Sequence, residues 1–149
     1  PLAVSSLQEL AEGRFQNAIA EVDSIPPDNV RRVVMCSGKV YYDLLEARRK
    51  ADNKEVAIIR IEQLYPFPEE ELKVIMQDYQ HVTDFVWCQE EPKNQGAWYN
   101  CQHRMKRVIP DKVYLNYVGR PASAAPAVGY MSLHLQQQKA LVEEALTIE

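Results

Sequence analysis

Short apolar runs alternate with amphipathic stretches along most of this chain, and this alternation constrains the fold more than any other feature. Four runs have the length of a buried strand, and four longer stretches repeat apolar residues at helical spacing. In sequence order, the predicted strands and helices span 33–36, 39–51, 56–61, 69–79, 85–88, 98–108, 113–117 and 132–146. Repeated strand–helix–strand units require right-handed crossovers. We therefore expect an α/β fold: a small doubly wound, mostly parallel sheet with helices on both faces.

The last predicted helix runs from about Ser132 to Leu146. Leu135, Leu141, Val142 and Ala145 are its candidates for the inward face. We expect these four side chains to pack against the sheet.

Residues 1–29 differ from the rest of the chain. They hold one short helical stretch, 6–13, and then a break at Pro26-Pro27. We interpret 1–29 as an N-terminal docking strap or linker that enters an α/β C-terminal domain, 30–149, from a preceding domain. The chain begins at Pro1 rather than at methionine, which favours a piece of a longer protein.

Composition excludes several functional classes. The net charge of −4 does not favour nucleic-acid binding, which needs a basic face. The longest apolar run is strand-sized, so we expect no membrane span, and the N-terminus lacks the pattern of a signal peptide. Three cysteines without paired spacing favour a reducing compartment over a disulfide framework.

Ligands of open α/β sheets bind outside the carboxyl ends of the strands. The loops at this edge are 37–38, 63–68, 89–96 and 119–130. Glu90 and Glu91 follow a buried strand, but neighbours in an extended segment point to opposite sides. We therefore expect a structural role for them: capping the helix that begins near Gly96, or contact with a neighbouring domain. The loop ending at Tyr130 is rich in small residues and in proline, and we expect it to pack against another domain or subunit.

Two interpretations remain open for the basic residues of the third helix. His103, Arg104, Lys106 and Arg107 are either a solvated face or, with Arg120 and Ser123 of the last loop, an allosteric site for a nucleotide or acyl-CoA phosphate. The Cys101-Gln102-His103 triplet lacks the spacing of a metal site. We predict no catalytic residue, no cofactor-binding residue and no metal ligand within this chain.

Four segments, 33–45, 59–68, 86–98 and 119–131, resemble the C-terminal domain of the 2-oxoglutarate dehydrogenase first component. The resemblance extends over essentially the whole chain. A more distant similarity, to the C-terminal domain of the transketolase superfamily, depends on the glycine after the first strand and the proline-rich turn after the second.

The resemblance implies an assembly domain of a thiamine-diphosphate- and magnesium-dependent enzyme, whose cofactors are bound by preceding domains. That enzyme decarboxylates 2-oxoglutarate in the tricarboxylic acid cycle and succinylates a lipoyl group on a succinyltransferase core. The implied partners of this chain are the preceding domains, a homodimer partner and that core. The chain alone is expected to be inactive. The alternative is a regulatory binding module for AMP or acetyl-CoA, and a paralogue acting on 2-oxoadipate also remains open. A bacterial-type enzyme would be cytoplasmic, and a eukaryotic one would lie in the mitochondrial matrix.

Overall fold

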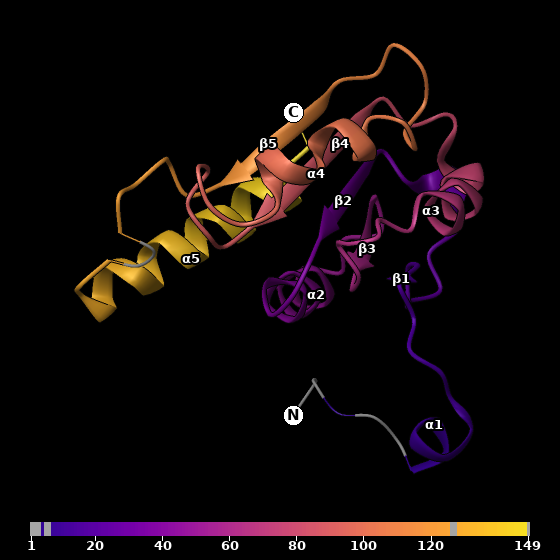
Figure 1. Ribbon diagram of the computed structural model, residues 1–149, viewed down its shortest axis with the longest axis horizontal. Helices are drawn as coiled ribbons and strands as arrows, with labels where there is room; N and C mark the ends of the chain where they lie inside the picture. The colour runs from indigo at the N-terminus through magenta and orange to yellow at the C-terminus, as the bar shows by residue number, and fades with distance from the viewer. Residues whose placement is uncertain (1–3, 5–6, 126–127, 149) are drawn as a thin grey trace.

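The computed structural model describes residues 4, 7–125 and 128–148, and a five-stranded sheet forms its centre (Figure 1). The strands are β1 (Ala18–Ile19), β2 (Arg32–Cys36), β3 (Val56–Ile61), β4 (Asp84–Gln89) and β5 (Leu115–Gly119). They lie in the order β1-β3-β2-β4-β5; β3, β2, β4 and β5 are parallel, whereas β1 is antiparallel to β3. The predicted doubly wound, mostly parallel α/β fold is confirmed.

Helices cover both faces of the sheet. Those of the body are α2 (Val40–Lys50), α3 (Glu69–Ile75) with its 3-10 continuation η2 (Met76–Tyr79), α4 (Trp98–Met105) and α5 (Met131–Leu146). Successive strand residues point to opposite faces. Val33 and Met35 of β2 therefore pack with α3, η2 and α4, whereas Val34 and Cys36 pack with α2 and α5. Within the described ranges, no helix is long and apolar enough to cross a membrane.

The prediction for the last strand was wrong by two residues. β5 begins at Leu115, not at Val113, and Tyr114 is 84% exposed. Lys112 has a left-handed backbone, with φ at 66°, so the chain is still turning just before residue 113. The parallel register then pairs Leu115 with Phe85 at one end of β5 and Gly119 with Gln89 at the other.

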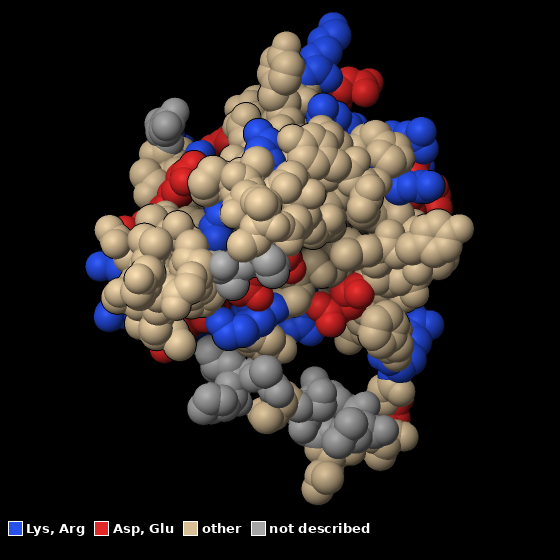
Figure 2. Space-filling view, turned by 60° about the vertical axis from the view of Figure 1, so that its left-hand side comes forward, with Lys and Arg blue, Asp and Glu red and all other residues tan. Residues whose placement is uncertain are grey.

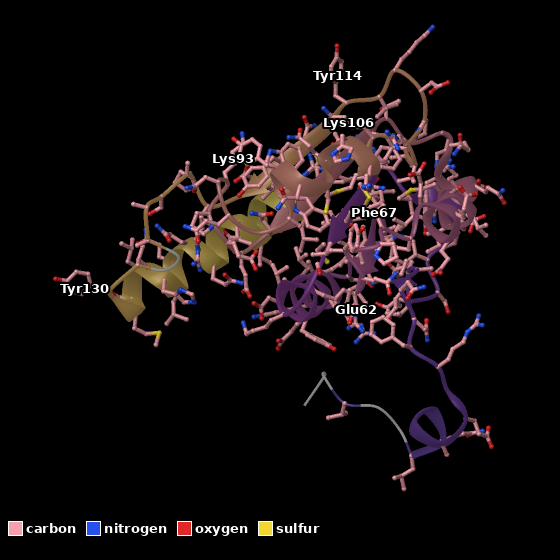
Figure 3. All side chains as sticks on the ribbon, viewed as in Figure 1. Glu62, Phe67, Lys93, Lys106, Tyr114 and Tyr130 are labelled. Carbon is pink, nitrogen blue, oxygen red and sulfur yellow. The ribbon has the colours of Figure 1, made fainter. Side chains whose placement is uncertain are left out.

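The prediction that Leu135 faces inward was also wrong. Leu135 is 61% exposed, and the buried residues of α5 are Leu141, Val142 and Ala145, all in its second half. The first half of α5 extends past the sheet, and Tyr130 projects from that free end (Figures 1 and 3). Helical periodicity identified the correct face of α5, but it could not show where the sheet ends.

The N-terminal segment divides into two parts. Helix α1 (Leu7–Glu12) stands apart from the body in Figure 1. By contrast, β1 pairs with β3 at the sheet edge. Just after β1, Glu21 pairs with the buried guanidinium of Arg48 in α2. Arg48 Nη2 also lies 2.7 Å from Asp23 Oδ2. The short helix η1 (Pro27–Asn29) then leads into β2. Residues 1–3, 5 and 6 of the expected strap lie outside the described residues, and its boundary at residue 29 stays a prediction.

Candidate functional site

A cavity of about 440 Å³ lies at the topological switch point of the sheet. From β2 the chain continues to β3, its neighbour on one side, whereas from β4 it continues to β5 on the opposite side of the sheet. The carboxyl ends of the adjacent strands β2 and β4 therefore flank a crevice. The cavity is lined by Ser37 and Gly38 after β2, by Gln89 and Glu91 around the end of β4, and by Arg104 of α4. This is the position at which doubly wound sheets hold ligands.

The side chain of Gln89 organises the floor of this cavity. Its Oε1 accepts hydrogen bonds from Trp87 Nε1 at 2.9 Å and from the backbone N–H of Trp98 at 3.1 Å. Its Nε2 donates to three carbonyl groups, the shortest contact being 2.8 Å to Gln95. The first turn of α4 is therefore capped by Gln89 and not by Glu90 or Glu91. Sequence reasoning missed this role, for which the one signal was an amide at the end of an apolar strand.

The basic residues in α4 and just after it do not lie together in one group. Arg104 is half-buried in the switch-point cavity, and His103 also lines it. Arg107 is exposed, with its Nη1 3.7 Å from Glu69 Oε2. On the face shown in Figure 2, Lys and Arg are scattered among Asp and Glu rather than gathered into one basic patch.

Arg120 and Ser123 line a different cavity, of about 190 Å³. Arg120 is buried, and its Nη2 donates to His134 Nδ1 at 3.1 Å and to Gln138 Oε1 at 3.2 Å. The Ser123 carbonyl accepts from Asn94 Nδ2 at 2.9 Å, which fixes this part of the loop against the segment after β4. The structure thus brings Arg120 and Ser123 together but places Arg104 and Arg107 elsewhere.

The three interdomain-contact candidates differ in their surroundings. Glu90 is half-buried, with its Oε2 3.4 Å from Gln138 Nε2. Glu91 is exposed at the rim of the switch-point cavity. Tyr130 is 77% exposed. Of the three, Tyr130 offers the largest surface for a partner, whereas Pro126 and Ala127 of the same loop lie outside the described residues.

A metal site requires several Cys, His, Asp or Glu side chains to lie close together. Within the described ranges, no group of three or more His, Cys, Asp or Glu side chains is arranged to hold a metal ion. Burial raises the pKa of the Cys36 thiol well above its usual range and that of Cys88 to about 12, so both thiols are protonated at neutral pH.

The sheet order and the helices on both faces define the class of this domain. A split-gene transketolase, solved as an inactive β4 tetramer, has the same fold with a TM-score of 0.58, at 14% identity over 89% of this chain and 44% of that one. A family model described as 2-oxoglutarate dehydrogenase C-terminal matches residues 4–146, and the chain belongs to that family.

Curated relatives agree with this assignment. The chain is 66% identical to the 2-oxoglutarate dehydrogenase E1 component of Haemophilus influenzae and 54% identical to that of Azotobacter vinelandii. It is 49% identical to an oxoglutarate dehydrogenase of Buchnera aphidicola. These alignments cover 98–99% of this chain but only 16% of each relative, so the chain spans about one sixth of their length.

Proposed function

We propose that this chain is the C-terminal assembly domain of a 2-oxoglutarate dehydrogenase E1 component. The family match over residues 4–146, combined with a chain that spans one sixth of its relatives, is the observation that carries this proposal. Thiamine diphosphate and magnesium would be bound by the preceding domains of the same protein. The whole enzyme would decarboxylate 2-oxoglutarate in the tricarboxylic acid cycle and succinylate the lipoyl group of a succinyltransferase core.

Exposed apolar side chains at two places support an assembly role. The first half of α5 and the residue before it expose Tyr130, Met131 and Leu135 at 77%, 72% and 61%. The N-terminal segment exposes Leu7 and Phe15. Large apolar side chains grouped on a surface favour a protein contact. We assign these two surfaces to the preceding domains and to the homodimer partner, and residues 1–29 to the docking strap.

The test uses the full-length protein. We expect it to decarboxylate 2-oxoglutarate when thiamine diphosphate and magnesium are present, and to do so faster than it decarboxylates 2-oxoadipate. Absence of turnover with 2-oxoglutarate would contradict the proposed activity, and a preference for 2-oxoadipate would assign the chain to a paralogue.

A pair of substitutions tests the assembly role separately. Leu135→Asp places a charge in the exposed surface of α5, and we expect sedimentation to show weaker subunit or interdomain association and lower turnover. Val74→Asp is the matched control, because Val74 is 64% exposed on α3 and lies outside the α5 surface that Leu135→Asp changes. Equal behaviour of the two variants would contradict a docking role for α5.

A second candidate function is a regulatory site for AMP or acetyl-CoA in the switch-point cavity. It is favoured by the position of the cavity and by Arg104 within it. Calorimetry of the full-length protein with each ligand tests it, with Arg104→Gln as the variant expected to abolish the heat. Arg107→Gln is the control, because Arg107 lies outside that cavity.

We place the enzyme in the bacterial cytoplasm, because the relatives named above come from bacteria. A eukaryotic source would place it in the mitochondrial matrix. Fractionation of the source cells, followed with an antibody to this chain, distinguishes the two.

A further inference from the structure

Three arginines are buried in the described part of the chain, and two of them face carboxylates. Arg32 is 7% exposed, with its Nε 2.6 Å from Asp84 Oδ2. Arg48 is 1% exposed and pairs with Glu21. Arg120 is 8% exposed, yet it forms no ion pair with any described carboxylate. Because removing a guanidinium from water is costly, buried arginines are ordinarily paired, and Arg120 departs from the pattern of this molecule.

The hydrogen bonds of Arg120 leave most of its donors free. Nη2 donates to His134 and Gln138, whereas Nε is buried without a partner, and Nη1 makes no hydrogen bond to the described residues. The Gln138 amide donates in turn to Asp43 Oδ2 at 2.8 Å and to Glu90 Oε2 at 3.4 Å. Among the described residues, the carboxylates of Asp43 and Glu90 therefore bind the neutral Gln138 amide and not the Arg120 guanidinium.

A second residue that lines this cavity also carries an unpartnered polar atom. Gln137 lines it together with Arg120, and Gln137 Oε1 is buried without a hydrogen-bond partner. Turning the Gln137 amide over would place its NH₂ donor where this oxygen now lies. With a volume of about 190 Å³, the cavity has room for a small anionic group and a few water molecules, but not for a nucleotide.

We propose that this cavity binds a single carboxylate group. The Arg120 guanidinium would supply the charge and the Gln137 amide a second hydrogen bond, an arrangement suited to the planar geometry of a carboxylate. The carboxylate belongs either to an acidic side chain of another protein segment or to a small free acid. This inference is independent of the proposed enzymatic activity, because it depends only on the unpartnered polar groups of Arg120 and Gln137, two residues that line the cavity.

The first arm of the test is an experimental structure of the full-length protein at side-chain resolution. An Asp or Glu carboxylate from another segment, within about 4 Å of the Arg120 guanidinium, identifies the acidic side chain as the occupant. In that case added acetate will not change the melting temperature.

The second arm applies if no protein carboxylate occupies the cavity. Acetate, at constant ionic strength, should then raise the melting temperature of the full-length wild-type protein by roughly 2–4 °C. Neutral acetamide should not. Arg120→Gln should lose the acetate shift, whereas Arg107→Gln, which removes an exposed arginine, should keep it.

Gln137→Leu keeps the proposal testable if Arg120→Gln does not fold. It removes the second donor without touching the bonds from Arg120 to His134 and Gln138, and we expect at least a halved acetate shift. A cavity that holds only water, in a protein whose melting temperature responds equally to acetate and to acetamide, overturns the proposal.

Discussion

The side-chain oxygen of Gln89 accepts the backbone N–H of Trp98 at 3.1 Å, so the last residue of β4 caps the helix that follows it nine residues later. Helix N-termini leave unpaired N–H groups, and a buried N-terminus needs an acceptor. The Gln89 amide provides it and also fixes the loop between the two elements through the Gln95 carbonyl. One side chain thus holds the strand, the loop and the helix that border the switch-point cavity.

Replacement of Gln89 by leucine should be strongly destabilising. Gln89→Leu would leave Trp87 Nε1 and the Trp98 N–H buried without an acceptor, and we expect a loss of roughly 2–4 kcal/mol in the free energy of unfolding. Urea unfolding measures it. Gln63→Leu is the matched control, because the Gln63 side chain makes one exposed hydrogen bond, to the Pro66 carbonyl, and its loss should cost less than about 1 kcal/mol. Equal losses would show that the capping role is wrong.

Gly119 lies too close to the neighbouring strand to carry a side chain. A Cβ at this position would meet the Gln89 carbonyl oxygen at 2.6 Å, and that atom belongs to the backbone. We expect Gly119→Ala to destabilise the domain by roughly 1–3 kcal/mol through displacement of β5. Gly129→Ala, where a Cβ meets nothing within 4 Å, should change stability by no more than about 0.5 kcal/mol. Thermal unfolding of the two variants compares them directly.

The buried ion pair of Arg48 with Glu21 should show strong coupling in a double-mutant cycle. Arg48→Met would leave Glu21 without its cation, and we expect a loss of about 3–5 kcal/mol in unfolding free energy. The double variant with Glu21→Gln should lose much less than the sum of the single changes. The exposed pair of Arg31 and Glu55, at 3.4 Å, is the control and should couple by less than about 1 kcal/mol.

The Asp23 carboxylate should make stability depend on pH in the acid range. Hydrogen bonds from Arg49 and, more weakly, from Arg48 lower the pKa of Asp23 to about 2, against the opposing effect of burial. A carboxyl with a lowered pKa in the folded state stabilises the fold above its unfolded value near 4, and this contribution is lost as the pH falls to about 2.

The Asp23→Asn variant isolates this effect. Wild type should be more stable than the variant at pH 5, and the difference in unfolding free energy should shrink steadily between pH 4 and pH 2. A difference that stays constant over this range would show that Asp23 does not titrate with its arginine partners.

The buried thiols should resist alkylation in the folded protein. Because burial raises the pKa of Cys36 and Cys88, little thiolate is available, and neither side chain is accessible. We expect iodoacetamide at pH 8 to label neither residue until urea unfolds the chain, as read by peptide mass spectrometry. Rapid labelling of Cys88 in the native protein would contradict its burial beneath α5.

The sequence was sufficient to predict the layers of the fold because buried parallel strands are nearly continuous apolar runs, and 33–36, 56–61 and 85–88 stand out as such. It was insufficient for β1, since two residues carry no periodicity. It also misplaced the start of β5. Val113 and Tyr114 extend the apolar run of the strand toward the N-terminus, but the chain is still leaving the turn at Lys112 there.

The candidate sites were harder to predict because they depend on distant contacts. Arg104 and Arg120 could be identified as cations at the carboxyl edge of the sheet, but only the structure separates them into two cavities. Likewise, Gln89 matters because the loop after β4 folds back and places its carbonyl groups and the Trp98 N–H around the Gln89 side chain. No local sequence pattern predicts that fold-back.

Residues 18–23 precede β2 in the sequence, but they contribute directly to the stability of the sheet and helices that follow. They close one edge of the sheet through β1 and supply the counter-ions of the innermost arginine, Arg48. A chain that began at residue 30 would therefore expose the edge of β3. It would also leave the buried Arg48 guanidinium without the carboxylates of Glu21 and Asp23. During synthesis residues 18–23 leave the ribosome before Arg48 and β3, so their strand pairing and their ion pairs can form only after those later residues have been made.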